Sequence, residues 1–77
     1  MDIQQKIGKR IRELRKEKGL SQEAFADLAR IDRTYVNSVE NGKRNISLKN
    51  IEKIANAFNI SISNFFYDDI FSDSKKK

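Results

Sequence analysis

Residues 21–42 read SQEAFADLARIDRTYVNSVENG, and this stretch carries the strongest structural signal in the chain. It predicts two short helices, 22–29 and 33–41, separated by only three residues. Such a short turn holds the two helices of a helix-turn-helix at a steep angle. Ala26 is small where the helices would approach each other, and Val36 and Val39 are apolar where the second helix would face the core. The stretch therefore predicts a helix-turn-helix at residues 22–41.

Helix starts of one kind recur along the chain. Each consists of an apolar residue, then Ser or Asp, then a second apolar residue five positions after the first, which is typical of an N-cap with a hydrophobic staple. The four matches are Leu20-Ser21 with Phe25, Ile31-Asp32 with Val36, Ile46-Ser47 with Ile51, and Ile60-Ser61 with Phe65. Residues that tolerate left-handed geometry follow three of the expected helices, at Gly19, Gly42 and Asn59.

These signals predict an all-α fold of five helices. The expected helices cover residues 3–18, 22–29, 33–41, 48–58 and 62–67. Residues 1–67 then form one domain, and residues 68–77, with three Asp followed by three Lys, are expected to be a frayed tail. Ile70 and Phe71 leave an alternative open, because they could extend the fifth helix or pack on a partner subunit.

The composition excludes most catalytic chemistry. The 77 residues include no cysteine and no histidine, which excludes disulfides, Cys/His zinc sites, thiol nucleophiles and imidazole bases. The acids are dispersed and the three glycines form no phosphate-binding loop. We therefore expect no enzyme, no metal and no cofactor. No signal peptide or membrane-spanning segment is recognisable, which predicts a cytoplasmic protein without a membrane partner.

Basic residues concentrate in the first half of the chain. The net charge is +5, and residues 1–46 alone hold eleven basic and seven acidic residues, a net charge of +4. Such an excess raises the affinity for phosphates, so nucleic acid is one candidate partner. A solvated surface rich in lysine is the alternative that the charge leaves open.

The second helix of the helix-turn-helix offers side chains that suit base recognition. Those expected to point outward, with Tyr35 beside them, are Arg33, Thr34, Asn37 and Ser38. Arginine can pair with guanine and asparagine with adenine, and a threonine methyl can contact a thymine methyl in the major groove. Phosphate contacts, which position a protein without reading sequence, are expected from the following loop at Lys43, Arg44 and Asn45. An ordinary solvated surface is the alternative, with Tyr35 packed partly on the core.

The stretch 21–42 resembles the lambda-repressor-like (XRE-type) helix-turn-helix superfamily of phage repressors and bacterial regulators, and the resemblance extends over about residues 4–67. Its most specific elements are Ser21-Gln22-Glu23, Ala26 and residues 36–42. Residues 32–51, DRTYVNSVENGKRNISLKNI, are similar to the controller proteins of restriction-modification systems. Those proteins control the timing of endonuclease expression by binding operators as dimers.

The resemblance implies a five-helix lambda-repressor-like domain that regulates transcription by binding a two-fold symmetric operator in double-stranded DNA as a homodimer. Gln22 would contact a phosphate and brace the second helix, while Arg33 and Thr34 would read bases. RNA polymerase is a further candidate partner, and the operator's place relative to the promoter would decide between repression and activation. The superfamily usually has glycine at the position of Arg30, so a left-handed backbone there would be strained.

The C-terminal end of the domain carries more apolar surface than a short terminal helix can bury alone. By the same resemblance, this end forms the two-fold interface, which would place the recognition helices about 34 Å apart on one face of the DNA. The side chains expected there are Ile62, Phe65, Phe66 and Ile70. Simple capping of the monomer core is the alternative.

Three other functions remain open from the sequence: a phage-type repressor, an antitoxin that binds both DNA and a toxin, and a protein-interaction module without DNA binding. An antitoxin would need a toxin-binding segment, for which only the short tail is available. An interaction module would have no need for the polar, basic face that Arg33, Thr34 and Arg44 provide.

Overall fold

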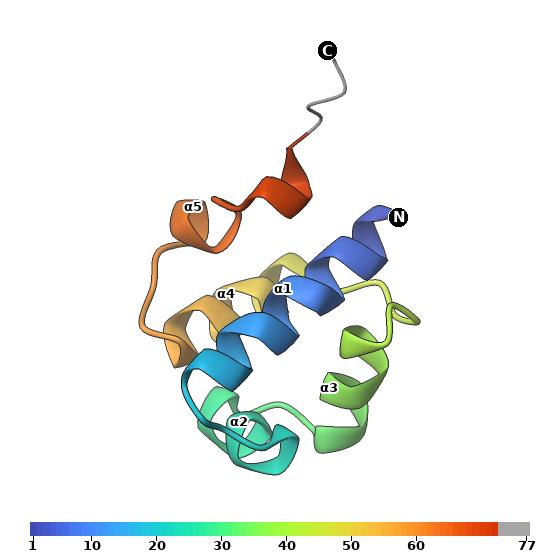
Figure 1. The fold of residues 1–77 in the computed structure, drawn as a ribbon. Helices are drawn as coiled ribbons and strands as arrows, with labels where there is room; N and C mark the ends of the chain where they lie inside the picture. Colours follow the sequence, from blue (N-terminus) through green and yellow to red (C-terminus); the bar gives the residue numbers. More distant parts are fainter. Residues whose placement is uncertain (73–77) are drawn as a thin grey trace.

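The computed structural model describes residues 1–72 and consists of helices and their connections over that range (Figure 1). The helices are α1 (Ile3–Glu17), α2 (Gln22–Ala29), α3 (Arg33–Glu40), α4 (Leu48–Ala57), α5 (Ile62–Phe65) and a short 3-10 helix, η1 (Asp69–Phe71). α1 packs on α3, and α2 packs on both α3 and α4. The predicted all-α, five-helix architecture is confirmed.

Side-chain oxygens cap the N-termini of the five α-helices. At the four predicted starts the oxygen accepts a hydrogen bond from a backbone N–H two or three residues later, over 2.9–3.3 Å. The capping residues are Ser21, Asp32, Ser47 and Ser61. α1 has a cap that the pattern did not include: Asp2 accepts from the N–H of Gln5 at 2.8 Å, and the Gln5 side chain accepts from the N–H of Asp2 at 2.9 Å.

A left-handed residue ends each of α1 to α4. These residues are Gly19 (φ 68°), Arg30 (φ 60°), Gly42 (φ 73°) and Asn59 (φ 60°). In the turn between α2 and α3, the N–H of Arg30 donates to the carbonyl of Asp27 at 3.2 Å, and the N–H of Ile31 donates to that of Ala26 at 3.0 Å. This Schellman pattern satisfies carbonyls that the helix leaves free, and it is repeated at the other three ends.

Replacing Arg30 with glycine should raise the free energy of unfolding by about 0.5–1 kcal/mol. A side chain in the left-handed region costs about 1–2 kcal/mol, and this relief exceeds the added freedom of glycine in the unfolded chain, about 0.4–1 kcal/mol. Asn59→Gly is the matched control at the same φ of 60°. Because asparagine tolerates this region, the control should gain less in urea denaturation. A loss of stability in Arg30→Gly would contradict this account of the turn.

Three phenylalanines form the centre of the core. Phe25, Phe58 and Phe65 are fully buried, and the rings of Phe25 and Phe58 stack with centroids 4.6 Å apart. Each such side chain stabilises the fold by about 1.5–3 kcal/mol when buried. Gly8 lets α1 lie directly on the last turn of α3, since a Cβ there would lie 2.3 Å from the carbonyl oxygen of Val39. α1 and α3 therefore approach each other at Gly8 too closely for any larger residue.

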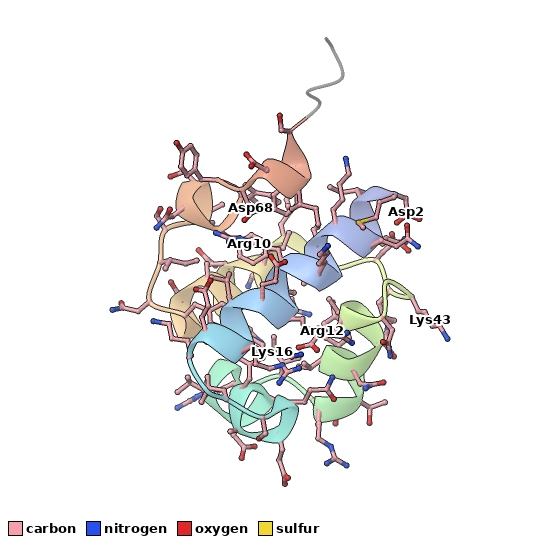
Figure 2. The ribbon with its side chains drawn as sticks, in the orientation of Figure 1. Asp2, Arg10, Arg12, Lys16, Lys43 and Asp68 are labelled. Atoms are coloured by element: carbon pink, nitrogen blue, oxygen red, sulfur yellow. The ribbon has the colours of Figure 1, made fainter. Side chains whose placement is uncertain are left out.

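The segment after α5 packs back on α1. Arg10 of α1 donates to the carbonyls of Phe65 and Asn64 at 2.7 and 2.9 Å, and it pairs with Asp68 at 3.2 Å (Figure 2). The rings of Phe66 and Phe71 meet edge to face at 5.0 Å. Residues 68–72 thus differ from the frayed tail expected from the sequence, while the rest of that tail, 73–77, lies outside the described residues.

α5 is shorter than predicted and ends at Phe65 instead of Tyr67. The chain tightens there, because the N–H of Tyr67 donates to the carbonyl of Asn64 three residues back, and the N–H of Asp68 donates to that of Phe66 two residues back. Over residues 1–72, no helix combines the length and the apolar character needed to cross a membrane.

Candidate nucleic-acid interface

α3 has a buried face and an exposed face, as the sequence predicts for the second helix of a helix-turn-helix. Val36 and Val39 are buried, whereas Arg33, Thr34 and Asn37 are exposed. The exposed side chains and Gln22, the first residue of α2, line one shallow depression of about 210 Å³. The structure thus brings four of the predicted DNA-contacting residues together on a single surface, which we call the reading face.

Hydrogen bonds of Gln22 join α2 to α3. The Gln22 amide Nε2 donates to Glu40 at 3.1 Å, and its Oε1 accepts from Nδ2 of Asn37 at 3.1 Å. Asn37 Oδ1 in turn accepts from Nδ2 of Asn41 at 3.2 Å. These bonds leave Gln22 and Asn37 in fixed positions at the edge of the reading face, before any partner binds.

A buried carboxylate lies behind this face. The Glu40 side chain is fully buried, and Arg15 of α1 donates to both of its oxygens at 2.7 and 3.0 Å. Arg15 also donates to the carbonyl of Leu20 at 2.9 Å, and the half-exposed Arg12 lies 3.5 Å from Glu40. Sequence reasoning missed Glu40 as a buried residue that joins α1, α2 and α3. Its place one turn after Val36, on the same side of the helix, was the available signal.

Opposing influences act on the Glu40 carboxyl. Burial by itself would raise its pKa, but the hydrogen bonds from Arg15 and Gln22, together with the charges of Arg15 and Arg12, outweigh burial. The pKa of Glu40 therefore lies below its ordinary value, and the hydrogen bond to Glu40 raises the pKa of Arg15. At neutral pH Glu40 is an anion that can accept hydrogen bonds but cannot donate them.

Acid should destabilise the fold through Glu40. Its folded-state pKa lies below the unfolded value of about 4.3, so the stabilisation is fully present above that pH and is lost as the pH falls through the folded-state pKa. Urea denaturation between about pH 6 and pH 2 should therefore show a steeper loss of stability in the parent than in Glu40→Gln, which has no proton to bind at this position. Equal pH dependence in the two proteins would contradict the prediction.

The loop after α3 places its polar residues beside the reading face and outside the depression. The Arg44 guanidinium lies over the ring of Tyr35, 4.7 Å from its centroid. Asn45 accepts a hydrogen bond from the Gln4 side chain, and Lys43 is exposed (Figure 2). Ser38 is half-buried, and its backbone carbonyl accepts from the N–H of Lys43 at 3.0 Å, closing α3.

An apolar groove opens on a different side, between α4 and α5. It has a volume of about 340 Å³, and the residues that line it are Leu48, Lys49, Ile51, Glu52, Ile62 and Phe66. Leu48 is 84% exposed and Ile62 is 47% exposed, which is high for apolar side chains on ordered helices. Two of the four predicted interface residues, Ile62 and Phe66, lie in this groove.

The other two predicted interface residues do not line the groove. Ile70 is half-buried on η1. The prediction for Phe65 is wrong, because its side chain is 0% exposed and packs in the monomer core. Phe65 lies on the inward side of a helix of only four residues, so its ring completes the core that Phe25 and Phe58 begin.

Comparisons with known proteins agree with this geometry. The helix-turn-helix family profile matches residues 11–65. The control protein C.MunI from Mycoplasma sp is 52% identical over 68 residues, which make up 87% of this chain and 92% of that protein.

Solved structures of controller proteins are also similar to this chain. The restriction-modification controller protein C.AhdI from Aeromonas hydrophila is 52% identical, with a TM-score of 0.78 over 82% of this chain and 96% of that one. The controller protein C.Esp1396I, solved as a tetramer in complex with its natural 35 base-pair operator, is 33% identical, with a TM-score of 0.80 over 86% and 87% of the two chains. The chain belongs to the helix-turn-helix family, and along most of its length it is similar to restriction-modification controller proteins.

Proposed function

We propose that this protein is a sequence-specific transcription regulator that binds a two-fold symmetric operator in double-stranded DNA as a homodimer. The observation that carries the proposal is the reading face, where Gln22, Arg33, Thr34 and Asn37 line one depression on the exposed side of α3. Its role is binding and not catalysis, and it acts in the cytoplasm, where its DNA lies.

The reading face fits the major groove of B-DNA. An α-helix can enter that groove, and α3 presents side chains of the types that recognise base edges. Arg33 is 66% exposed at the first turn of α3, and within residues 1–72 only a distant contact of 3.9 Å to Glu23 holds it, so it can pair with guanine. Thr34 beside it offers a methyl group and a hydroxyl. Ser38 is half-buried and therefore contributes less to base recognition.

Phosphate contacts on the flanks of the reading face would set the orientation of α3. Gln22 lies at the N-terminus of α2 and is hydrogen-bonded to Asn37 and Glu40 of α3. The loop that follows the C-terminus of α3 supplies Lys43, Arg44 and Asn45. The Tyr35 ring holds the Arg44 guanidinium in place, which lowers the entropy that Arg44 loses when it binds a phosphate. Contacts of this kind strengthen binding to any DNA and are weakened by salt.

The apolar groove between α4 and α5 is where we place the two-fold interface. Burial of Leu48, Ile62 and the exposed edge of Phe66 against a second copy removes apolar surface from water. Lys49 and Glu52 at the same groove carry opposite charges, so a two-fold axis can bring each near its counterpart in the other copy. A dimer built this way presents two reading faces to one side of the DNA.

A role as the controller of a restriction-modification system has support from the similarity to C.MunI and C.AhdI. DNase I footprinting of the DNA upstream of the protein's own gene tests this role. We expect protection of two symmetric half-sites about 10 base pairs apart, upstream of this gene and of an adjoining endonuclease gene. Absence of protection there, with specific binding elsewhere, would contradict the controller role.

Replacing Ile62 with glutamate should weaken dimerisation by at least about a hundredfold. The substitution occurs twice in a two-fold interface, and burial of an unpaired carboxylate costs well over 1 kcal/mol at each site. Leu28→Glu is the matched control, since Leu28 is 57% exposed on α2, away from the groove, while Ile62 is 47% exposed. Sedimentation velocity at micromolar concentration should show a monomer for Ile62→Glu and a dimer for the control. A dimer in both would rule out this interface.

A further inference from the structure

Four side chains behind and along the reading face form one directed chain of hydrogen bonds. Asn41 donates to Asn37, Asn37 donates to Gln22, and Gln22 donates to Glu40, over 3.2, 3.1 and 3.1 Å. At the inner end, Arg15 holds Glu40 through two further bonds of 2.7 and 3.0 Å. The chain runs from the exposed surface of α3 to a carboxylate that is buried between α1 and α3.

The direction of every bond in this chain follows from Glu40. A carboxylate held by Arg15 is an acceptor only, so Gln22 must turn its NH₂ group toward Glu40 and its oxygen toward Asn37. Asn37 must then turn its own NH₂ group toward Gln22, which leaves its oxygen to accept from Asn41. A half turn exchanges the donor and acceptor ends of a side-chain amide, and only its hydrogen-bond partners decide between the two orientations. Here one buried charge removes that freedom from two amides in succession.

We propose that Glu40 is a positioning residue for base recognition, which acts through Gln22 to fix the orientation in which Asn37 presents its amide to the DNA. This inference rests on the proposed function. Asn37 is exposed, and the hydrogen bonds to Gln22 and Asn41 use one of its two N–H donors and one of its two acceptor positions. One donor and one acceptor remain, which is the pair that adenine requires at N7 and N6 in the major groove. Asn37, with its orientation fixed, therefore selects adenine.

The substitution Glu40→Gln tests this inference, because the amide that it introduces can donate where the carboxylate only accepts. If that amide keeps its oxygen on Nε of Arg15 and turns its NH₂ group toward Gln22, it gives up the bond from the second Arg15 nitrogen. The chain of hydrogen bonds can then run in the opposite direction, and Asn37 is free to flip. The experiment measures binding of the full chain to its selected operator and to single base-pair variants of it. Asn37→Ala first identifies the base pair that Asn37 reads, as the position at which the preference for adenine is lost.

We expect Glu40→Gln to lower the preference for adenine at that base pair by at least about fivefold, within the range of about 5- to 150-fold that a bidentate contact supplies. Preferences at other base pairs and the dependence of binding on salt should stay as in the parent. In the Asn37→Ala background, Glu40→Gln should have no further effect on that preference. A purely structural role for Glu40 would instead weaken binding to all duplexes alike.

Gln22→Leu supplies a second route, because it interrupts the chain and leaves the Arg15–Glu40 pair intact. If circular dichroism shows that Glu40→Gln does not fold, Gln22→Leu alone tests the inference. It should relax the same adenine preference, in addition to any uniform loss from a missing phosphate contact. The inference is overturned if folded Glu40→Gln or Gln22→Leu keeps the full preference, or if Asn37→Ala alters no preference. Failure of the proposed function looks different, since the parent itself would then prefer no duplex.

Discussion

Replacing Glu40 with alanine should lower the free energy of unfolding by about 3–5 kcal/mol. Removal of one partner from a buried ion pair leaves the other charge buried without compensation, and Arg15, with only 12% of its side chain exposed, would be that charge. A domain of this size has a total stability of about 3–5 kcal/mol from its core, so the variant should be largely unfolded at 25 °C. Urea denaturation, followed by circular dichroism at a fixed protomer concentration, measures the loss.

Two controls distinguish the contribution of the buried pair to stability from that of an ordinary surface charge. Arg12→Ala removes the half-exposed arginine that lies 3.5 Å from Glu40, and it should cost less than about 1 kcal/mol. The double variant Arg15→Met with Glu40→Leu replaces both charges by apolar side chains and should recover most of the stability lost in Glu40→Ala. If Glu40→Ala were as stable as Arg12→Ala, the buried pair would contribute no more to stability than a half-exposed charge does.

Replacing Arg33 with alanine should weaken binding to the selected operator by about 5- to 150-fold. Arg33 is exposed at the start of α3, lines the depression with Thr34, and has no close partner within the described residues. Its loss should therefore remove the proposed base contact and leave the fold unchanged. Fluorescence anisotropy with operator and with unrelated DNA should show a large loss for the first and a small loss for the second.

The matched control is Lys53→Ala, which removes the same charge from an exposed position on α4. It should change binding to both DNAs by less than about threefold at about 150 mM salt, where charges far from the phosphates are screened. Arg33→Ala binding the operator as tightly as the parent does would exclude Arg33 from base reading.

Helix positions were predictable because each boundary depends on neighbouring residues. The caps at Ser21, Asp32, Ser47 and Ser61 bond to backbone groups two or three residues away, so a short pattern contains the whole interaction. The left-handed turn at Arg30 was anticipated from the resemblance instead, because the superfamily usually has glycine at that position. The exposed side of α3 followed from helical periodicity once Val36 and Val39 were assigned to the core.

Contacts between distant residues were not predictable in this way. Glu40 and Arg15 are 25 positions apart in the sequence, and Arg10 and Asp68 are 58 apart. No local pattern therefore predicts either pair. The sequence therefore predicts a frayed tail at residues 68–72, because no neighbouring residue indicates that Asp68 pairs with Arg10. Phe65 was assigned to the dimer interface for a related reason. An apolar side chain on a short terminal helix suits a core and an interface equally until the geometry of α5 is known.

Selection of bound duplexes from a random library at about 150 mM salt tests most directly whether α3 reads a two-fold symmetric DNA sequence. We predict one enriched palindrome, with half-sites about one helical turn apart, that Arg33→Ala fails to enrich to the same degree. Recovery of no preferred sequence, with binding that disappears as the salt concentration rises, would contradict sequence reading by α3 and reduce the basic face to nonspecific attraction for phosphates.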